Sequence, residues 1–325
     1  MNDTPITRRE SIKKIAKLSA GIAAASGLSL SASSKNILAA ETAPIAENVS
    51  KQAANGAWLI DGLGSAPGFS IRDLTRRMFA QAGGMEKFIS KGDIVVIKPN
   101  ISWAQPPHLA VTTNPDVMMA VIELCQEAGA KSVRIVDHTI HDARRCFGVT
   151  GAGDVAKKTG ADLVHPRQSL MKDINLKGKR LDAWPVLTPI VEADKVINLP
   201  IAKVHGLSGL TLGMKNWIGA VGGRRNALHQ DIHQSIVDLA QFFRPTLTLI
   251  DAVRVLAANG PSGGREEDVR VLNRLILSND PVAIDARAAL LFNKKPEDIG
   301  HIRLAHQQGL GHIDLNAVRQ VQVTV

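Results

Sequence analysis

Short apolar runs alternate with longer amphipathic segments along most of the chain. Residues 94–99 form one such run, which a proline ends, and a short apolar run between breakers is typical of a buried strand. Asn114 suits the N-cap, and Pro115 the first position, of a helix that we expect over residues 117–128. The pattern therefore predicts a strand followed by a helix.

The same alternation continues toward the C-terminus. Further strands are expected over residues 132–137, 193–200, 246–251 and 272–277, and further helices over 149–160, 227–243 and 281–292. Strands separated by helices indicate an α/β protein with a mostly parallel sheet and helices on both faces, as one compact domain or two closely joined lobes. Ligands of such sheets bind at the carboxyl ends of the strands.

The N-terminal segment has a different pattern. Residues 7–14 are basic and include the paired Arg8 and Arg9, and a weakly hydrophobic, small-residue stretch follows over residues 15–32. A transmembrane helix needs about 20 firmly apolar residues, so we expect no stable membrane anchor. The pattern is typical of a twin-arginine signal peptide, with a short basic amphipathic helix as the alternative.

This interpretation predicts export of the folded protein to the periplasm by the twin-arginine translocase. The expected organisation is a signal peptide over residues 1–43, a flexible leader over 44–57 and an α/β domain over 58–325. Residues 1–43 carry six basic and three acidic side chains, so their removal lowers the formal net charge from +9 to +6. The remaining chain has no long basic run and few aromatic residues, which argues against nucleic acid and favours a small anionic ligand.

The chain has two cysteines, too few for a disulfide framework. Cys125 lies in an apolar helical pattern and is expected to be a buried thiol. A Cys125–Cys146 bridge is the alternative in an oxidising compartment.

Polar residues follow the expected strands directly, and in a parallel sheet they would converge at one edge. These residues are Lys98 and Asn100, then Asp137, His138 and His141, then Lys203 and His205, and finally Asp251. Asp137 can fix the tautomer of a neighbouring histidine, which makes His138 or His141 a candidate acid or base. The alternative is that Asp137 caps the next segment and the histidines face water.

A glycine-rich stretch follows Lys203 and His205, with six glycines from Gly206 to Gly223. Such a backbone approaches a ligand closely and suits anion binding by amide groups. Lys215 within it is expected to hold an anion, or to act as a nucleophile if desolvated; the alternative is a flexible loop with a solvated lysine. The candidate ligand- or cofactor-binding residues are Lys98, Asn100, Gly213, Lys215 and Asn216, and the candidate catalytic residues are His138, Lys203 and His205.

His229 and His233 are four residues apart in the expected helix over 227–243, so both imidazoles would share one face and reach one metal ion. The alternative is two histidines on a half-exposed surface. The remaining histidines have no convergent polar context and are interpreted as structural: His165, His301, His306 and His312.

Several of these segments together resemble the domain-of-unknown-function family 362 (DUF362). The matching pieces are Val96-Ile97-Lys98-Pro99-Asn100, Thr113-Asn114-Pro115, Glu127-Ala128-Gly129-Ala130, Lys203-x-His205, Met214-Lys215-Asn216-x-Ile218-Gly219, Asn259-Gly260-Pro261-x-Gly263-Gly264 and Asp280-Pro281-Val282-Ala283-x-Asp285. The resemblance covers nearly all of the chain after residue 57. Many relatives carry a ferredoxin-like segment with cysteine clusters, which this chain lacks, so we expect no iron–sulfur cluster of its own.

The chain is also similar, more distantly, to the N-terminal domain of nickel-pincer lactate racemases. His205 and Lys215 stand ten residues apart around a glycine-rich turn, His229 follows, and His138 or His141 precedes them. In that family the lysine anchors the pincer nucleotide, the last histidine binds nickel and the other two exchange protons. The racemase Gly-Gly-x-Lys is replaced here by Leu212-Gly213-Met214-Lys215, and the separate C-terminal domain is not evident.

The expected function is that of an exported DUF362 protein with an anion- or cofactor-binding site and acid/base chemistry on a small anionic substrate. His205 is the expected base, and Lys215 is expected to hold the anion or cofactor. The candidate cofactors are a divalent metal, nickel or zinc, or a metal-nucleotide. The alternatives are a non-catalytic accessory protein that carries a ligand or cofactor for an exported redox enzyme, and a structural partner subunit.

Overall fold

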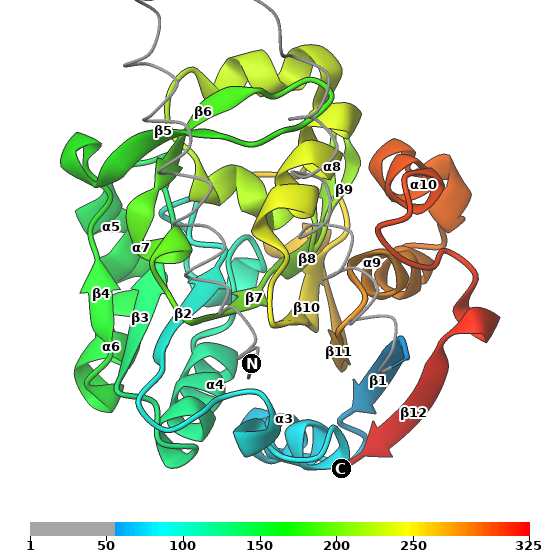
Figure 1. Cartoon of the computed structure of the whole chain (residues 1–325). Helices are drawn as coiled ribbons and strands as arrows, with labels where there is room; N and C mark the ends of the chain where they lie inside the picture. Colours follow the sequence, from blue (N-terminus) through cyan, green and yellow to red (C-terminus); the bar gives the residue numbers. More distant parts are fainter. Residues whose placement is uncertain (1–55) are drawn as a thin grey trace, which may run out of the picture.

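The structure, a computed structural model, describes residues 56–325, and a large sheet forms its middle layer (Figure 1). The strands of this sheet are β1 (Trp58–Leu63), β2 (Ile94–Pro99), β3 (Ser132–Val136), β4 (Asp162–Val164), β7 (Lys195–Leu199), β8 (Ile201–His205), β9 (Gly209–Thr211), β10 (Leu247–Leu256), β11 (Val269–Ser278) and β12 (Arg319–Thr324). Their order is β12-β1-β11-β10-β7-β2-β3-β4, with β8 paired to both β10 and β9. A separate hairpin is formed by β5 (Met171–Asn175) and β6 (Ala183–Leu187).

The central strands β10, β7, β2, β3 and β4 are parallel to one another, whereas β11 is antiparallel to both β10 and β1. Strands β2 and β7 are almost wholly buried, as expected for apolar runs in a sheet that is covered on both faces. The predicted mostly parallel α/β sheet is confirmed.

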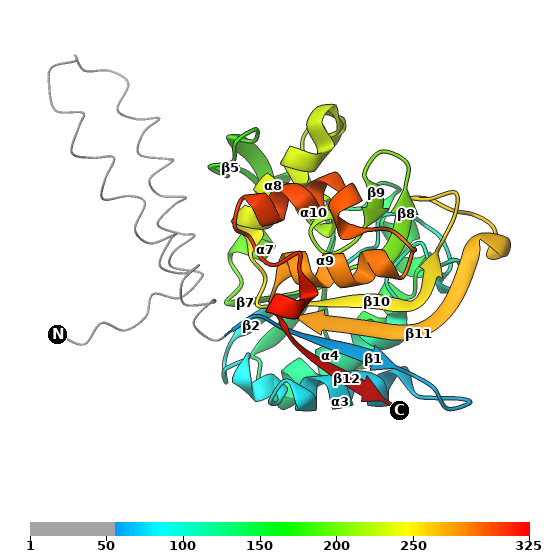
Figure 2. The same cartoon turned by 90° about the vertical axis from the view of Figure 1, so that its right-hand side faces the viewer.

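Helices cover both faces of the sheet (Figure 2). One face carries α3 (Ile71–Gln81), α4 (Pro115–Glu127), α5 (Ala143–Val149) and α6 (Ala152–Thr159), and the other carries α7 (Thr188–Val191), α8 (Ile232–Phe243), α9 (Pro281–Leu290) and α10 (Gly300–Gln307). The 3-10 helices are η1 (Met85–Lys87), η2 (Pro107–Leu109), η3 (Gln168–Leu170), η4 (Lys215–Ala220), η5 (Arg225–Asp231), η6 (Glu266–Asp268), η7 (Pro296–Asp298) and η8 (Leu315–Ala317). A separate apolar core fills the space under each helical layer.

Local capping explains why two predicted helices begin where they do. The Asn114 side chain accepts a hydrogen bond from the Asp116 amide at the start of α4, and Pro115 occupies the first turn. The Asp280 side chain accepts from the Val282 and Ala283 amides at the start of α9. Both helices begin close to their predicted starts.

Two predicted helices are interrupted near their N-termini. The helix expected over residues 149–160 is present as α6, which begins only at Ala152 because Gly151 adopts a left-handed φ of 79°, while Val149 is the last residue of α5. The helix expected over residues 227–243 becomes α-helical only at Ile232, after η5, where Asp231 caps α8 by accepting from the Gln234 amide. The second interruption changes the relation between His229 and His233.

Both cysteines are free and buried, so the alternative of a Cys125–Cys146 bridge does not hold in this structure. Burial raises the pKa of Cys125 to about 12 and that of Cys146 to about 11, which leaves both thiols protonated at neutral pH. Within residues 56–325, no helix has the length and apolar character needed to cross a bilayer. The predicted signal peptide and most of the predicted leader lie outside the described residues.

Candidate functional site

A buried ion pair joins the carboxyl ends of β2 and β3. Lys98 Nζ lies 2.5 Å from Asp137 Oδ1, and both side chains are fully buried. Lys98 also donates to the Pro99 carbonyl at 2.8 Å, and the second carboxylate oxygen of Asp137 accepts from the Ile101 amide at 2.6 Å. Burial lowers the pKa of Lys98, while Asp137 opposes that shift. The Lys98 charge is therefore already compensated within the protein.

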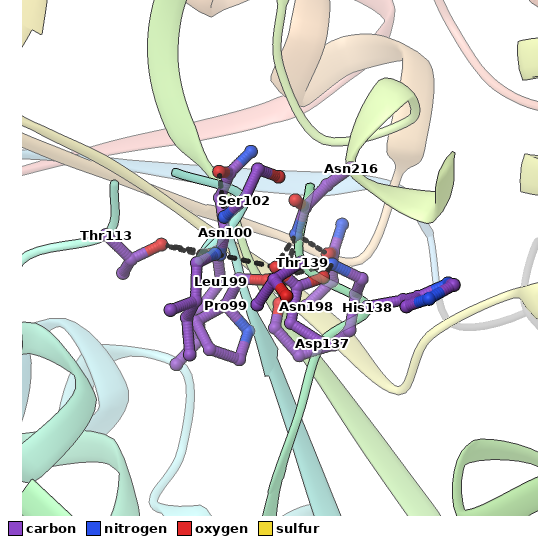
Figure 3. Close-up of polar contacts among 12 residues, drawn as sticks. Pro99, Asn100, Ser102, Thr113, Asp137, His138, Thr139, Asn198, Leu199 and Asn216 are labelled. Carbon is purple, nitrogen blue, oxygen red and sulfur yellow. Dashed lines mark hydrogen bonds and ion pairs between the residues drawn. The ribbon is translucent and has the colours of Figure 1, made fainter. Parts of the chain in front are cut away.

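An amide network fixes the neighbouring strand end (Figure 3). The Asn216 side chain donates to Asn198 Oδ1 at 2.8 Å and to the Lys98 carbonyl at 3.0 Å, and Asn198 donates to the Gly213 carbonyl at 2.9 Å. Asn100 is buried nearby, and its backbone amide donates to Thr113 Oγ1 at 2.9 Å. Asn216 thus ties the glycine-rich stretch to the ends of β2 and β7.

The turn before Lys215 is held by a carboxylate from α9. Asp285 accepts from the Gly213 amide at 2.7 Å and from the Met214 amide at 3.0 Å. A Cβ on Gly213 would lie 2.8 Å from Asp285 Oδ1, so only glycine allows this approach. Burial raises the pKa of Asp285 to about 7. The Gly213 amide, predicted to face a ligand, is thus occupied by Asp285.

Gly219 lies directly against the buried ion pair. A Cβ at this position would lie 2.0 Å from Asp137 Oδ1 and 2.8 Å from Lys98 Nζ. The Gly219 carbonyl accepts from the His138 amide at 2.7 Å. The glycine-rich stretch therefore packs its backbone, rather than a side chain, against Lys98 and Asp137.

Two further lysines are buried without a carboxylate partner. Lys203, on β8, is 1% exposed and donates to the Val111 carbonyl at 2.7 Å. Lys215, the first residue of η4, is 8% exposed, and its amine makes no hydrogen bond or ion pair with any residue in the described range 56–325. Burial lowers the pKa of each to about 7, and the charge of Lys215 contributes to the shift of Lys203.

His205 lies beside these lysines with a defined tautomer. Its Nδ1 accepts from the Leu207 amide at 3.1 Å and from the Ser208 amide at 3.3 Å, so the proton of the neutral ring is on Nε2. Burial, and then the charges of Lys215, His229 and Lys203, lower the pKa of His205 to about 3. His205 therefore presents a neutral N–H donor. We call Lys203, His205, Lys215 and His229 the lysine–histidine cluster.

His138 has the opposite tautomer and lies with the ion pair rather than with the lysine–histidine cluster. Its Nδ1 donates to the Val221 carbonyl at 2.8 Å, which leaves Nε2 as an acceptor, and burial lowers its pKa. Figure 3 shows its ring pointing away from Asn198 and Asn216. Arg225 donates to the His138 carbonyl at 2.8 Å and fixes this segment.

His141 is exposed and accepts from the Ala104 amide at 3.3 Å. Its ring packs edge-on against Trp103, with the ring centroids 4.9 Å apart. Of the two histidines after β3, His138 is therefore the one held within the protein.

The two candidate metal ligands have different partners. The His229 ring stacks on His205 with the ring centroids 6.3 Å apart, whereas the His233 ring stacks on His301 with the centroids 5.9 Å apart. In the described part of the chain, no three His, Cys, Asp or Glu side chains are placed so that they could share a metal ion. His229 and His233 stack on different rings.

A cavity of about 320 Å³ lies at the opposite end of β10 from the strand pair that carries Lys203. Several of its polar groups form hydrogen bonds within the protein. Asp280 caps α9 and also binds His312 Nδ1 at 2.7 Å, and the guanidinium of Arg244 donates to the Gln241 carbonyl at 2.9 Å. Because two lysines are buried together in the lysine–histidine cluster without a carboxylate partner among residues 56–325, we take that cluster as the candidate site.

Sequence reasoning missed three residues of this region. Asn198 stands inside an otherwise apolar strand, and a buried asparagine there is a detectable signal of a network. Asp285 lies within the motif Asp280-Pro281-Val282-Ala283-x-Asp285, and the sequence predicts only a structural role for His301. Their roles depend on contacts between distant parts of the chain, as 72 residues separate Asp285 from Gly213.

Comparison with known proteins finds one relative by sequence and two more distant similarities among solved structures. The thylakoid-associated protein sll1697 of Synechocystis sp. (strain ATCC 27184 / PCC 6803 / Kazusa) is 28% identical over 244 residues, which cover 73% of this chain and 74% of that protein. The lactate racemase apoprotein from Thermoanaerobacterium thermosaccharolyticum superposes with a TM-score of 0.40 and 15% identity, covering 78% of this chain and 56% of that one. A Thermotoga maritima protein superposes with a TM-score of 0.39 and 10% identity, covering 73% and 59%.

This chain thus spans little more than half of the two solved structures. The sequence pattern of DUF362, a domain of unknown function, matches residues 95–289. This match covers more than half of the chain and confirms the resemblance seen in the motifs. The protein therefore belongs to the DUF362 family.

Proposed function

We propose that this protein binds a small anionic molecule at the lysine–histidine cluster and exchanges a proton with it. The observation that supports this most strongly is the burial of Lys203 and Lys215 without a carboxylate partner. Burying an amine without a counter-charge is costly, and the amine loses its proton more easily as a result. A bound anion would supply the missing negative charge and would favour the protonated, ammonium form of both lysines.

The tautomers suggest a role for each side chain. His205 offers its Nε2 proton to an anionic oxygen and stays neutral, which differs from the expectation that His205 is the base. Lys215 has no hydrogen-bond partner in the described chain and a pKa of about 7, so it can give or take a proton near neutral pH. The Lys98–Asp137 pair joins the ends of β2 and β3 and packs against Gly219, which lies on the same short helix as Lys215.

A bound organic cofactor is a second candidate, favoured by the same free amine of Lys215. An amine without a partner is a suitable attachment point for a nucleotide, and His229 lies in the same cluster. Intact-protein mass spectrometry after native export tests this proposal. A mass above that of the chain, which is lost in Lys215→Ala, supports a cofactor, and the chain mass alone contradicts it.

We also propose that residues 1–43 direct export by the twin-arginine route. The paired Arg8 and Arg9 support this, and so does the cyanobacterial relative named for association with thylakoids. Replacing both arginines by lysine should retain the protein in the cytoplasm of a Gram-negative host on fractionation. Export of this double variant at the normal level would contradict the proposal.

Isothermal titration calorimetry with acetate and inorganic phosphate tests the anion site. At pH 8 the free lysines are largely neutral, so binding should take up protons, and the heat should vary with the ionisation enthalpy of the buffer. Lys203→Met and Lys215→Met should each weaken binding by about tenfold or more. Lys157→Met, on the exposed face of α6, is the matched control and should bind normally. Absence of binding, or binding that neither buried lysine affects, would contradict the proposed function.

A further inference from the structure

His301 is a fully buried histidine without a hydrogen bond. It is the second residue of α10, its relative exposure is 0%, and neither ring nitrogen has a partner in the described chain. A buried polar group left without a partner costs roughly 1–3 kcal/mol, and such groups are rare unless a function accounts for them. The ring therefore requires an explanation beyond packing.

The backbone amides at the start of α10 also lack hydrogen-bond partners in the part of the chain that the structure describes. Its N-cap residue, Ile299, has no side-chain acceptor, and the backbone amides of Gly300 and His301 donate no hydrogen bond within residues 56–325. These free amides carry the positive end of the helix dipole. His301 is the second residue of the helix and so lies in this same first turn, where the Cα–Cβ bond tilts toward the helix N-terminus.

This end of α10 lies close to the hairpin of β8 and β9, which follows Lys203 and carries His205 (Figure 2). A Cβ on Gly209 of that hairpin would lie 3.1 Å from Ile299 Cδ1. Burial lowers the pKa of His301 to about 3, and the next causes are the charges of His233, Lys215 and His205. His301 is therefore neutral and lies within the electrostatic reach of the lysine–histidine cluster.

The ring of His233 stacks on the ring of His301. The two rings are nearly parallel, with an interplanar angle of 17°, and His233 Nδ1 is also buried without a partner in the described chain. A Cβ on Gly300 would lie 2.7 Å from the His233 ring, so the glycine permits this stacking. The stack fixes the orientation of both imidazoles.

We propose that His301 and the first turn of α10 form a second anion-accepting contact beside the lysine–histidine cluster, and that the ligand carries two separated anionic groups, as a short dicarboxylate does. This inference rests on the proposed function and specifies its ligand. Lys203 and Lys215 bind the first group. The neutral His301 ring and the free amides of α10 bind the second, as uncapped helix N-termini bind oxyanions elsewhere.

The test compares three probes by calorimetry: acetate, succinate and inorganic phosphate. Succinate should bind about tenfold tighter than acetate, because only succinate reaches both contacts. His301→Leu should reduce the affinity for succinate to that for acetate, and should leave acetate unchanged. Phosphate, a compact dianion, controls for charge, so its affinity should not respond to His301→Leu. The control variant is His306→Leu, on the exposed face of the same helix.

Equal affinities of the wild-type protein for acetate and succinate would overturn the inference and leave the proposed function intact. A loss of all three probes in His301→Leu would also overturn it, since this would indicate a purely structural role. If none of the probes binds to the wild-type protein, the proposed function itself fails.

A measurement on the unaltered protein keeps the inference testable even if His301→Leu does not fold. In long-range ¹H–¹⁵N NMR spectra of the wild-type protein, succinate should shift the His301 ring nitrogens, whereas acetate should not. Ring nitrogens that do not respond to succinate would contradict the second contact.

Discussion

Lys98 Nζ lies 2.5 Å from Asp137 Oδ1, and Gly219 covers this pair with its backbone. The contact joins the ends of β2 and β3 and supports the stretch that carries Lys215. Because both side chains are fully buried, each charge depends on the other for compensation. The ion pair is therefore part of the support of the candidate site rather than its ligand-binding surface.

Asp137→Asn should strongly destabilise the protein. The substitution leaves the Lys98 ammonium buried without its counter-charge, and breaking such a pair costs about 3–5 kcal/mol. Chemical denaturation should show this loss in the free energy of unfolding, and the double variant Lys98→Met, Asp137→Asn should recover part of it. Asp154→Asn, at an exposed position on α6, is the control. A loss below about 1 kcal/mol would show that the pair is not held as described.

Gly219→Ala should destabilise the protein and weaken anion binding together. The added Cβ would lie 2.0 Å from Asp137 Oδ1, so the stretch around Lys215 must move away from the ion pair. Overpacking of this kind costs about 1–3 kcal/mol. Gly206→Ala is the matched control, because a Cβ there meets no atom within 4 Å. Equal stabilities of the two variants in denaturant titrations would contradict the close packing at Gly219.

The alternation of apolar runs and helical segments was sufficient to predict the parallel sheet. It also predicted that Lys98, Asp137 and Lys203 gather near strand ends, because strand order does not alter which end of a parallel strand is the carboxyl end. The interruption at Asp231 was not predicted, because a 3-10 turn and an α-helix share nearly the same local preferences.

The sequence alone does not predict which groups each buried side chain contacts. His301 lies 68 residues after His233, and nothing in the local pattern brings these two rings together. The tautomer of His205 depends on two backbone amides of a tight turn, and that of His138 on the carbonyl of Val221. Such contacts follow from tertiary packing, which the spacing of residues alone does not specify.

The free energy of unfolding of the ligand-free protein should rise with pH between about 7 and 8.5, because above this range the cysteine thiols, whose folded-state pKa values are raised, begin to oppose the effect of the lysines. The folded-state pKa values of Lys203 and Lys215 are about 7, below the value of about 10.4 for an unfolded chain, so the unfolded state binds more protons in this window. Below pH 7 the lysines are charged in both the folded and the unfolded state, so the full free-energy cost of burying the charged amines remains. Each lysine contributes up to about 1.4 kcal/mol per pH unit to the slope of the free energy of unfolding against pH.

Denaturant titrations across this pH range should show a flatter slope for Lys203→Met and for Lys215→Met. Lys157→Met, at an exposed position, should retain the slope of the unaltered protein. A slope that neither buried-lysine variant changes would show that both amines find a counter-charge in solution.

His138 and His205 should show opposite tautomers in long-range ¹H–¹⁵N NMR spectra. His138 donates from Nδ1 to the Val221 carbonyl, whereas Nδ1 of His205 accepts from the Leu207 and Ser208 amides, so the proton is on Nδ1 in His138 and on Nε2 in His205. With a pKa of about 3, His205 should also stay neutral down to about pH 4. Exposed His306 is the internal reference for the spectra. A His205 ring that takes up a proton near pH 6 would mean that it can act as the base, and Lys215 would then no longer be needed for the proton exchange.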